Sequence, residues 1–182
     1  MKMAQQKALN MALIVEDGTG LTDADSYISL VDARAYALKY GYSLSIDDAA
    51  ADIELRKGAL YIGLFESSFS GRRLSDSQSL AWPRVNAYKC AGNDQIDLPS
   101  DSAPLEIKCA QVIAANFYAT GLDVRANDDG LGVASKEVVG AVKVSYFDNG
   151  HTGKSVEITE ATDMLSNYMC VGSSFTLRTV RV

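Results

Sequence analysis

The sequence has few of the side chains on which metal sites and nucleophilic catalysis depend. It contains one histidine, three cysteines and three prolines among 182 residues. His151 lies in a glycine-rich stretch with no cysteine nearby, so a metal site or a general base lacks the partners that it needs. The sequence has no Gly-x-Ser-x-Gly motif, and any catalytic triad would have to use the same histidine. We therefore expect no enzyme activity, no metal and no cofactor.

The cysteines are odd in number and widely spaced. Cys90, Cys109 and Cys170 include no Cys-x-x-Cys pair. This pattern argues against a disulfide framework and against a structural zinc site. We expect three reduced thiols in a cytosolic fold.

Long hydrophobic runs are also missing. The longest apolar stretches, at 11–15 and 138–144, fall far short of the roughly 20 residues that cross a bilayer. The first residues are mostly polar and show no small-residue cleavage pattern. We expect neither a membrane segment nor export.

Positive charge is scarce. Lys and Arg number 17 against 23 Asp and Glu, which leaves a net charge of −6. Proteins that grip nucleic acid draw their affinity from clustered Lys and Arg that release counterions from phosphate, so tight DNA binding is disfavoured. Arg72, Arg73 and Arg84 are the only residues dense enough to form a local basic patch.

The composition is that of a folded domain, with 47% hydrophobic and 22% charged residues. We predict an α+β fold, mainly a helical bundle with a small β-sheet or hairpin element. Residues 1–10 are expected to be a flexible extension before a single domain at 11–182. Within that domain, we assign residues 170–182 to partner docking.

Helices are predicted where capping residues precede apolar residues at helical spacing. Ser29 begins one that Gly41 ends, with Leu30, Ala33, Ala37 and Tyr40 on one face. Further helices are expected at 48–65, where Gly58 weakens the helix, from Ser102 to Gly121 with Pro104 in the first turn, and at 160–168.

Strands are predicted at residues 12–15 and at 142–146, where Val142, Val144 and Tyr146 alternate with polar side chains. Asn149 and Gly150 supply hairpin-turn chemistry, and the return strand would contain Val156 and Ile158. A last strand is expected at 175–182.

Residues 66–102 are irregular, and loops of such length are usually functional or ordered by a neighbour. This loop carries Arg72, Arg73, Trp82 and Arg84, which could form a single-strand platform of stacking and charge. The stronger interpretation is that Trp82 anchors the loop on the helices while the arginines pair with carboxylates.

Two further motifs are better explained without ligands. Residues 150–155 read GHTGKS, like the end of a phosphate-binding P-loop, but the first glycine of that motif is replaced by Asp148. The acidic pairs lack the ligand order of a calcium-binding loop, and we assign them to helix starts, turns and solvated surface. These pairs are Asp23 and Asp25, Asp47 and Asp48, and Asp128 and Asp129.

Several short motifs follow one another along most of the chain, to about residue 147. The motifs are IVEDGTG at 14–20, ADSYIS at 24–29, Asp32 to Tyr36 with Gly41, GRR at 71–73, QSLAWPR at 78–84, Ile96 with Leu98-Pro99, the helix with Glu106 to Lys108 and Ala110, and residues 133–146. In this order they resemble a family of phage proteins labelled DnaT-like putative single-stranded-DNA-binding proteins.

The resemblance implies a structural virion protein, a head-to-tail connector adaptor that joins the portal to the tail. It implies a cyclic homo-oligomer of about twelve copies, contacts with the portal and with the next tail or nozzle protein, and passive contact with double-stranded DNA in the channel. The chain would assemble in the bacterial cytoplasm and be located in the virion neck. An acidic channel wall fits this function because DNA must slide through it.

The proposed partner interface has two parts. The first is Arg72, Arg73, Trp82 and Arg84 in the long loop, ordered by the neighbouring subunit. The second is the C-terminal segment that docks on the portal or tail, with contact residues Phe175, Leu177, Arg178 and Arg181.

Two alternatives stay open. A single-stranded-DNA-binding protein of phage replication predicts salt-sensitive binding that depends on Arg72, Arg73 or Trp82. A hydrolase predicts a pocket with convergent polar groups.

Overall fold

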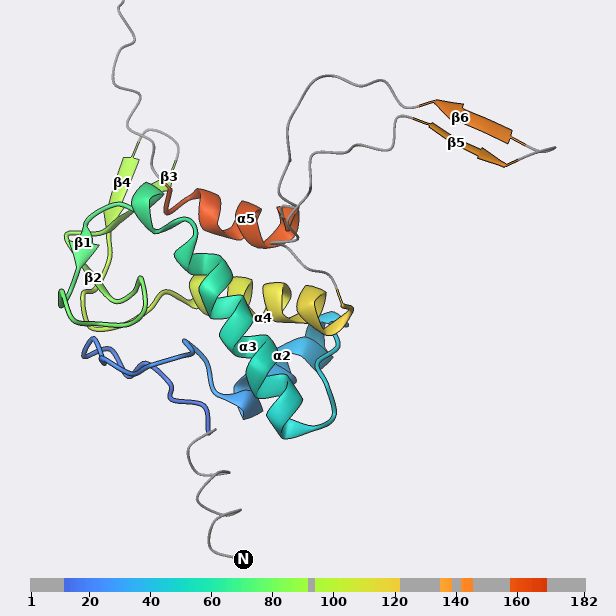
Figure 1. Cartoon of the computed structure of the whole chain (residues 1–182). Coiled ribbons are helices and arrows are strands. Elements are labelled where there is room, and N and C mark those ends of the chain that lie inside the picture. Colours follow the sequence, from blue (N-terminus) through green and yellow to red (C-terminus); the bar gives the residue numbers. More distant parts are fainter. Residues whose placement is uncertain (1–11, 92–93, 122–134, 139–141, 146–157, 170–182) are drawn as a thin grey trace, which may run out of the picture. The chain divides into compact units, whose positions relative to one another are not determined.

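The computed structural model describes residues 12–91, 94–121, 135–138, 142–145 and 158–169 (Figure 1). This part of the chain has the predicted α+β class, with four α-helices, one 3-10 turn and three two-stranded antiparallel sheets. The helices are α2 (Leu30–Tyr40), α3 (Asp48–Gly63), α4 (Leu105–Ala119) and α5 (Thr159–Ser166), and the 3-10 turn is η1 (Glu66–Ser68). The strand pairs are β1 (Arg72–Arg73) with β2 (Arg84–Val85), β3 (Tyr88–Ala91) with β4 (Asp94–Asp97), and β5 (Ser135–Val138) with β6 (Val142–Ser145).

The chain divides into two compact units. One contains all four helices with the first two strand pairs, and the other, within 123–157, contains β5 and β6. The predicted strand at 142–146 is found as β6 (Val142–Ser145), which pairs with the preceding β5. Val156 of the expected return strand lies outside the described residues. Alternation identifies a strand without identifying its partner. Ile158 is instead a buried residue at the start of α5.

Helix α2 is confirmed from cap to cap. The Ser29 hydroxyl accepts a hydrogen bond from the Asp32 amide at 3.1 Å, and Gly41 ends the helix with a φ of +81°. Ala33 and Ala37 are buried as expected, but Tyr40 is 55% exposed. The buried face of α2 therefore ends one turn before the predicted residue.

Helices α3 and α4 pack against each other more extensively than any other pair of described elements. Figure 1 shows the two helices, teal and yellow, crossing each other. Gly58 permits this approach, because a Cβ atom built there would lie 2.4 Å from the Gln111 carbonyl oxygen. The glycine that weakens α3 locally is thus required by its packing. Helix α4 is buried on several sides, as predicted, but it begins after Pro104 and Ser102 does not cap it. Pro104 has extended backbone angles, which delays the start of the helix.

Gln111 connects α4 to two other parts of the chain. Its side chain is fully buried, its Oε1 accepts from the Tyr27 amide at 2.9 Å, and its Nε2 donates to Ser26 Oγ at 2.8 Å and to the Leu55 carbonyl at 2.9 Å. The amide side chain therefore links the N-terminal loop, α3 and α4 through satisfied hydrogen bonds.

Residues 12–15 form a single parallel bridge, between Val15 and Ser26, where a strand was predicted. The following turn is closed by Glu16, whose buried carboxylate accepts from the amides of Gly18 at 2.9 Å, Gly20 at 2.8 Å and Leu21 at 3.0 Å. The Glu16 side chain thus supplies the hydrogen-bond acceptors that carbonyl groups of a neighbouring strand would supply in a β-sheet.

Cys90 in β3 is disulfide-bonded, which corrects the expectation of three reduced thiols. An odd number of widely spaced cysteines therefore does not exclude a disulfide bond. Cys109 is free and buried, and burial raises the pKa of its thiol.

No helix in the described ranges is long and apolar enough to cross a membrane.

Candidate functional site

The residues between α3 and β2 surround an open depression with a volume of about 630 Å³. It lies where α3 ends and where η1, β1 and β2 follow, so the arginines singled out in the sequence meet at one place. The lining residues are Gly63, Leu64, Glu66, Ser67, Phe69, Gly71, Arg72, Arg73, Asp76 and Arg84. We call this feature the arginine depression.

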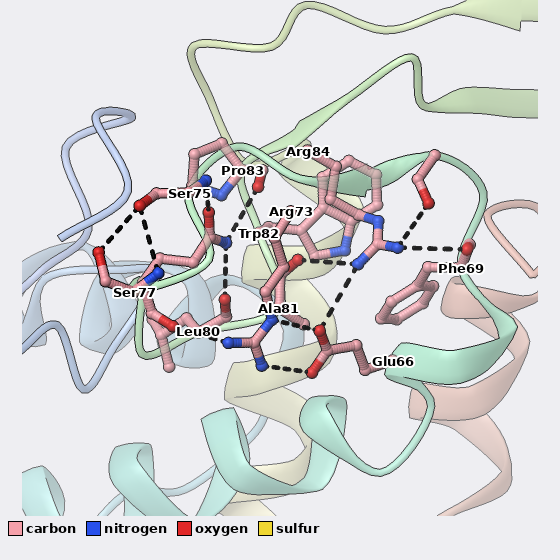
Figure 2. A network of polar contacts seen from close by, with 12 residues as sticks. Glu66, Phe69, Arg73, Ser75, Ser77, Leu80, Ala81, Trp82, Pro83 and Arg84 are labelled. Carbon is pink, nitrogen blue, oxygen red and sulfur yellow. Dashed lines mark hydrogen bonds and ion pairs between the residues drawn. The ribbon is translucent and has the colours of Figure 1, made fainter. Parts of the chain in front are cut away.

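Arg73 is held by Glu66 and by the main chain. Its Nε and Nη2 donate to the two carboxylate oxygens of Glu66, the second at 2.6 Å, and its Nη1 donates to the Gln78 carbonyl at 2.7 Å (Figure 2). The hydrogen bonds from Arg73 hold the pKa of Glu66 below its ordinary value of 4.5, and the same carboxylate raises the pKa of Arg73. Most of the hydrogen-bonding capacity of Arg73 is therefore already used.

Arg84 is buried beneath the depression and also serves the main chain. Its guanidinium donates to the carbonyl oxygens of Ser70 at 2.8 Å and Gly71 at 2.9 Å. It also donates to those of Ala81 at 3.2 Å and Phe69 at 3.4 Å (Figure 2). Burial lowers the pKa of Arg84, and its nearest carboxylate, Glu66, lies 3.9 Å away. Arg84 therefore stabilises the loop by satisfying buried carbonyls, a role the sequence could not distinguish from ligand binding.

Trp82 is 0% exposed and cannot stack on a base. Its ring centroid lies 5.7 Å from that of Phe69 and 5.8 Å from that of Tyr168, which follows α5. The Arg84 guanidinium carbon lies 6.0 Å from the centroid of the Trp82 ring. Trp82 is thus buried within its own chain, and its two ring partners lie just after η1 and just after α5. The stacking role considered for it is wrong, because the aromatic face is covered by its own chain.

Arg72 differs from the other two arginines. It is exposed, and within the part of the chain that the structure describes it forms no ion pair or side-chain hydrogen bond. Three arginines and the two carboxylates of Glu66 and Asp76 give the lining a net charge of +1, in a chain whose total is −6. The depression is therefore a locally positive surface with one guanidinium available to a ligand.

The motifs of the N-terminal region and the long loop meet in this fold. The Tyr27 hydroxyl accepts from the Ala81 amide at 3.0 Å, and the Ser79 amide donates to the Leu21 carbonyl at 3.0 Å. Burial raises the pKa of Tyr27. The described residues of the 66–102 segment thus make contacts within their own chain and include four short strands. The expectation that a neighbouring subunit orders this segment stays a prediction.

Gln78 organises the turn between β1 and β2. Its Nε2 donates to the carbonyls of Leu80 at 2.7 Å and Pro83 at 3.0 Å, and its Oε1 accepts from the Ser75 amide at 2.9 Å (Figure 2). Sequence reasoning missed the roles of Gln78 and Glu66. Their only signal was their position within and just before the motif-rich segment.

The remaining candidates give no second site. No group of three metal-ligating side chains occurs in the described ranges, and Asp47 is the N-cap of α3, as expected of a helix start. Several predicted features lie outside the described residues. They are the extension at 1–10, Asp128 and Asp129, the GHTGKS loop with His151, the turn at Asn149 and Gly150, the strand at 175–182, and the contact residues Phe175, Leu177, Arg178 and Arg181.

A family model described as "Putative DnaT-like ssDNA binding protein" matches residues 11–182. The chain belongs to this family. No curated protein and no solved structure matches the chain.

The DnaT-like family description overturns the head-to-tail connector function expected from the sequence and agrees with the alternative, a single-stranded-DNA-binding protein. The connector hypothesis gave too much weight to the net charge. A total of −6 is a property of the whole chain, and it does not exclude a local positive surface such as the arginine depression.

Proposed function

We propose that the chain binds single-stranded DNA and that the arginine depression contacts its phosphates. The observation that carries this proposal is the exposed guanidinium of Arg72, which has no ion pair or side-chain hydrogen bond to another described residue. It lies in a locally positive depression of a chain that belongs to a DnaT-like family. Arginine suits this role because its planar donors bind phosphate in a bidentate manner.

The three arginines contribute in different ways. Arg72 has its donors available for a phosphate, whereas Arg73 and Arg84 contribute positive potential while their donors are used by Glu66 and by main-chain carbonyls. Because one arginine carries the direct contact and the whole chain is acidic, the affinity is modest and falls steeply with salt.

The test is binding of a fluorescein-labelled oligothymidylate of about 20 nucleotides, followed by fluorescence anisotropy at several salt concentrations. Arg72→Ala is expected to weaken binding roughly two- to fivefold, the size of one exposed charge contact. It should also lower the slope of log affinity against log salt by about 0.7, the value of one lost phosphate contact on a single strand.

Lys57→Ala is the matched control, because Lys57 is an exposed cation on α3 that does not line the depression. It changes the net charge by the same amount. Equal losses for the two variants would mean that total charge and not the depression determines binding. Absence of binding by the unmodified chain at low salt would refute the function itself.

The other expectations stay predictions. These are the absence of enzyme activity, self-association into a ring, the absence of membrane association, and the cellular location.

A further inference from the structure

Three tyrosines cluster where α2 ends. Tyr36 and Tyr40 lie one turn apart on the helix, with ring centroids 4.5 Å apart and planes tilted by 39°. Gly41 then reverses the chain with its positive φ, and the ring of Tyr42 stacks on Tyr36 at 6.1 Å with planes only 15° apart. Tyr36 is thus the middle ring of a three-ring cluster, and we call this feature the tyrosine cluster.

The inner rings are fixed and the outer ring is open. Tyr36 and Tyr42 are half-buried, burial raises the pKa of both hydroxyls, and the Tyr42 hydroxyl donates to Glu160 in α5. Tyr40 is 55% exposed, and within the described ranges no other aromatic side chain is exposed. A rigid backing behind an open ring is the arrangement that a stacking ligand requires, because little side-chain entropy is lost on binding.

A cation accompanies the open ring. The Lys39 ammonium lies 5.2 Å from the centroid of Tyr40, and Lys39 is exposed, with no ion pair to a carboxylate of the described residues. Its flexible side chain can leave the ring for a nearby phosphate while a base takes its place on the ring. An exposed aromatic ring beside a mobile cation is the combination with which proteins bind single strands without reading their sequence.

We propose that a base of single-stranded DNA stacks on Tyr40, backed by Tyr36, while Lys39 contacts the adjoining phosphate. This inference rests on the proposed function and adds a second contact surface of different chemistry. The arginine depression offers charge but little accessible ring surface, because Phe69, which lines it, is 5% exposed and the neighbouring Trp82 is 0% exposed. The tyrosine cluster supplies the stacking that the depression lacks, so this part of binding depends on the base and much less on salt.

The experiment compares two labelled probes of equal length and charge, oligothymidylate and an abasic deoxyribose-phosphate oligomer. Tyr40→Ala is expected to lose roughly tenfold in affinity for oligothymidylate, the effect of one lost stacking contact, and to bind the abasic probe like the unmodified chain. Tyr40→Phe keeps the ring and should retain the affinity for both probes. Leu38→Ala is the matched control, since Leu38 is 86% exposed on the same helix but carries no ring.

Each outcome decides between the two proposals. If Arg72→Ala weakens binding and Tyr40→Ala does not, this inference is refuted and the proposed function stays intact. An equal loss on both probes would also refute it, because the role of Tyr40 would then not depend on a base. No binding of either probe by the unmodified chain would overturn both proposals. Circular dichroism of each variant checks that the exposed substitutions leave the fold unchanged.

Discussion

Glu66 and Arg73 face each other in a bidentate pair, with Nε and Nη2 of the arginine donating to the two oxygens of one carboxylate. Such pairs are stronger and more directional than single charged contacts. The pair joins η1, directly after α3, to β1, so it fixes one wall of the arginine depression. It also explains why an arginine that looks available in the sequence is not available in the fold.

This pair makes stability depend on acidic pH. The pKa of Glu66 is lower in the folded chain than its ordinary 4.5, so the unfolded chain takes up a proton there first as the pH falls. The stabilisation is therefore complete above pH 4.5 and is lost as the pH falls through the lower, folded value. Urea denaturation across this range should show a smaller decline in unfolding free energy for Glu66→Gln than for the unmodified chain.

Asp97→Asn is the control for this prediction. Asp97 is an exposed carboxylate of β4 without an ion pair to any residue that the structure describes. Its variant should retain the pH dependence of the unmodified chain. The same dependence in Glu66→Gln would show that the pair contributes nothing to stability at acidic pH.

Trp82 provides a direct optical test of the site. It is the only tryptophan in the chain and is 0% exposed, packed against Phe69 and Tyr168. Its emission should be blue-shifted and resistant to quenching by iodide, and saturating oligothymidylate should leave its intensity unchanged. Strong quenching by the oligonucleotide would mean that a base reaches the indole, contrary to its burial.

Local signals predicted the elements of this fold that depend on neighbours in sequence. Ser29 and Gly41 determine where α2 begins and ends, and Asp47 caps α3, because a cap needs only residues within one turn. Pro104 shows the limit of such signals, since its extended angles moved the start of α4 past the predicted cap.

The clustering of the three arginines could be predicted from sequence, but the contacts that each one makes could not. Arg72, Arg73 and Arg84 meet at one depression, as their density suggested. Whether each guanidinium faces solvent, a carboxylate or buried carbonyls depends on how residues distant in sequence close around it. The same holds for Tyr40, whose spacing placed it on a buried face that in the fold ends at Ala37.

Gly58 and Gly63 form a natural pair for separating helix propensity from packing. Both lie in α3, but a Cβ atom at Gly58 would meet the Gln111 carbonyl at 2.4 Å, whereas one at Gly63 would meet nothing within 4 Å. Gly58→Ala is expected to lower the unfolding free energy by about 1–3 kcal/mol, because α3 and α4 must move apart. Gly63→Ala should raise it by up to about 1 kcal/mol, since alanine favours the helix. Urea denaturation measures both, and a gain in stability for Gly58→Ala would contradict the close approach of the two helices.

Gln111→Leu tests the buried link between the N-terminal loop and the helices. Leucine is similar in size but leaves the Tyr27 amide without the acceptor that Gln111 Oε1 supplies at 2.9 Å. An unsatisfied buried donor costs about 1–3 kcal/mol, so we expect a loss of that size in unfolding free energy. Hydrogen exchange at the Tyr27 amide should accelerate more than the loss of global stability explains, because the hydrogen bond that this amide donates to Gln111 is removed.

Gln95→Leu, at an exposed position of β4, is the control, and its unfolding free energy should stay within about 0.5 kcal/mol of that of the unmodified chain. Equal stability of the two leucine variants would contradict this prediction. It would mean that apolar packing can replace the hydrogen bonds of Gln111 and that other contacts hold the N-terminal loop.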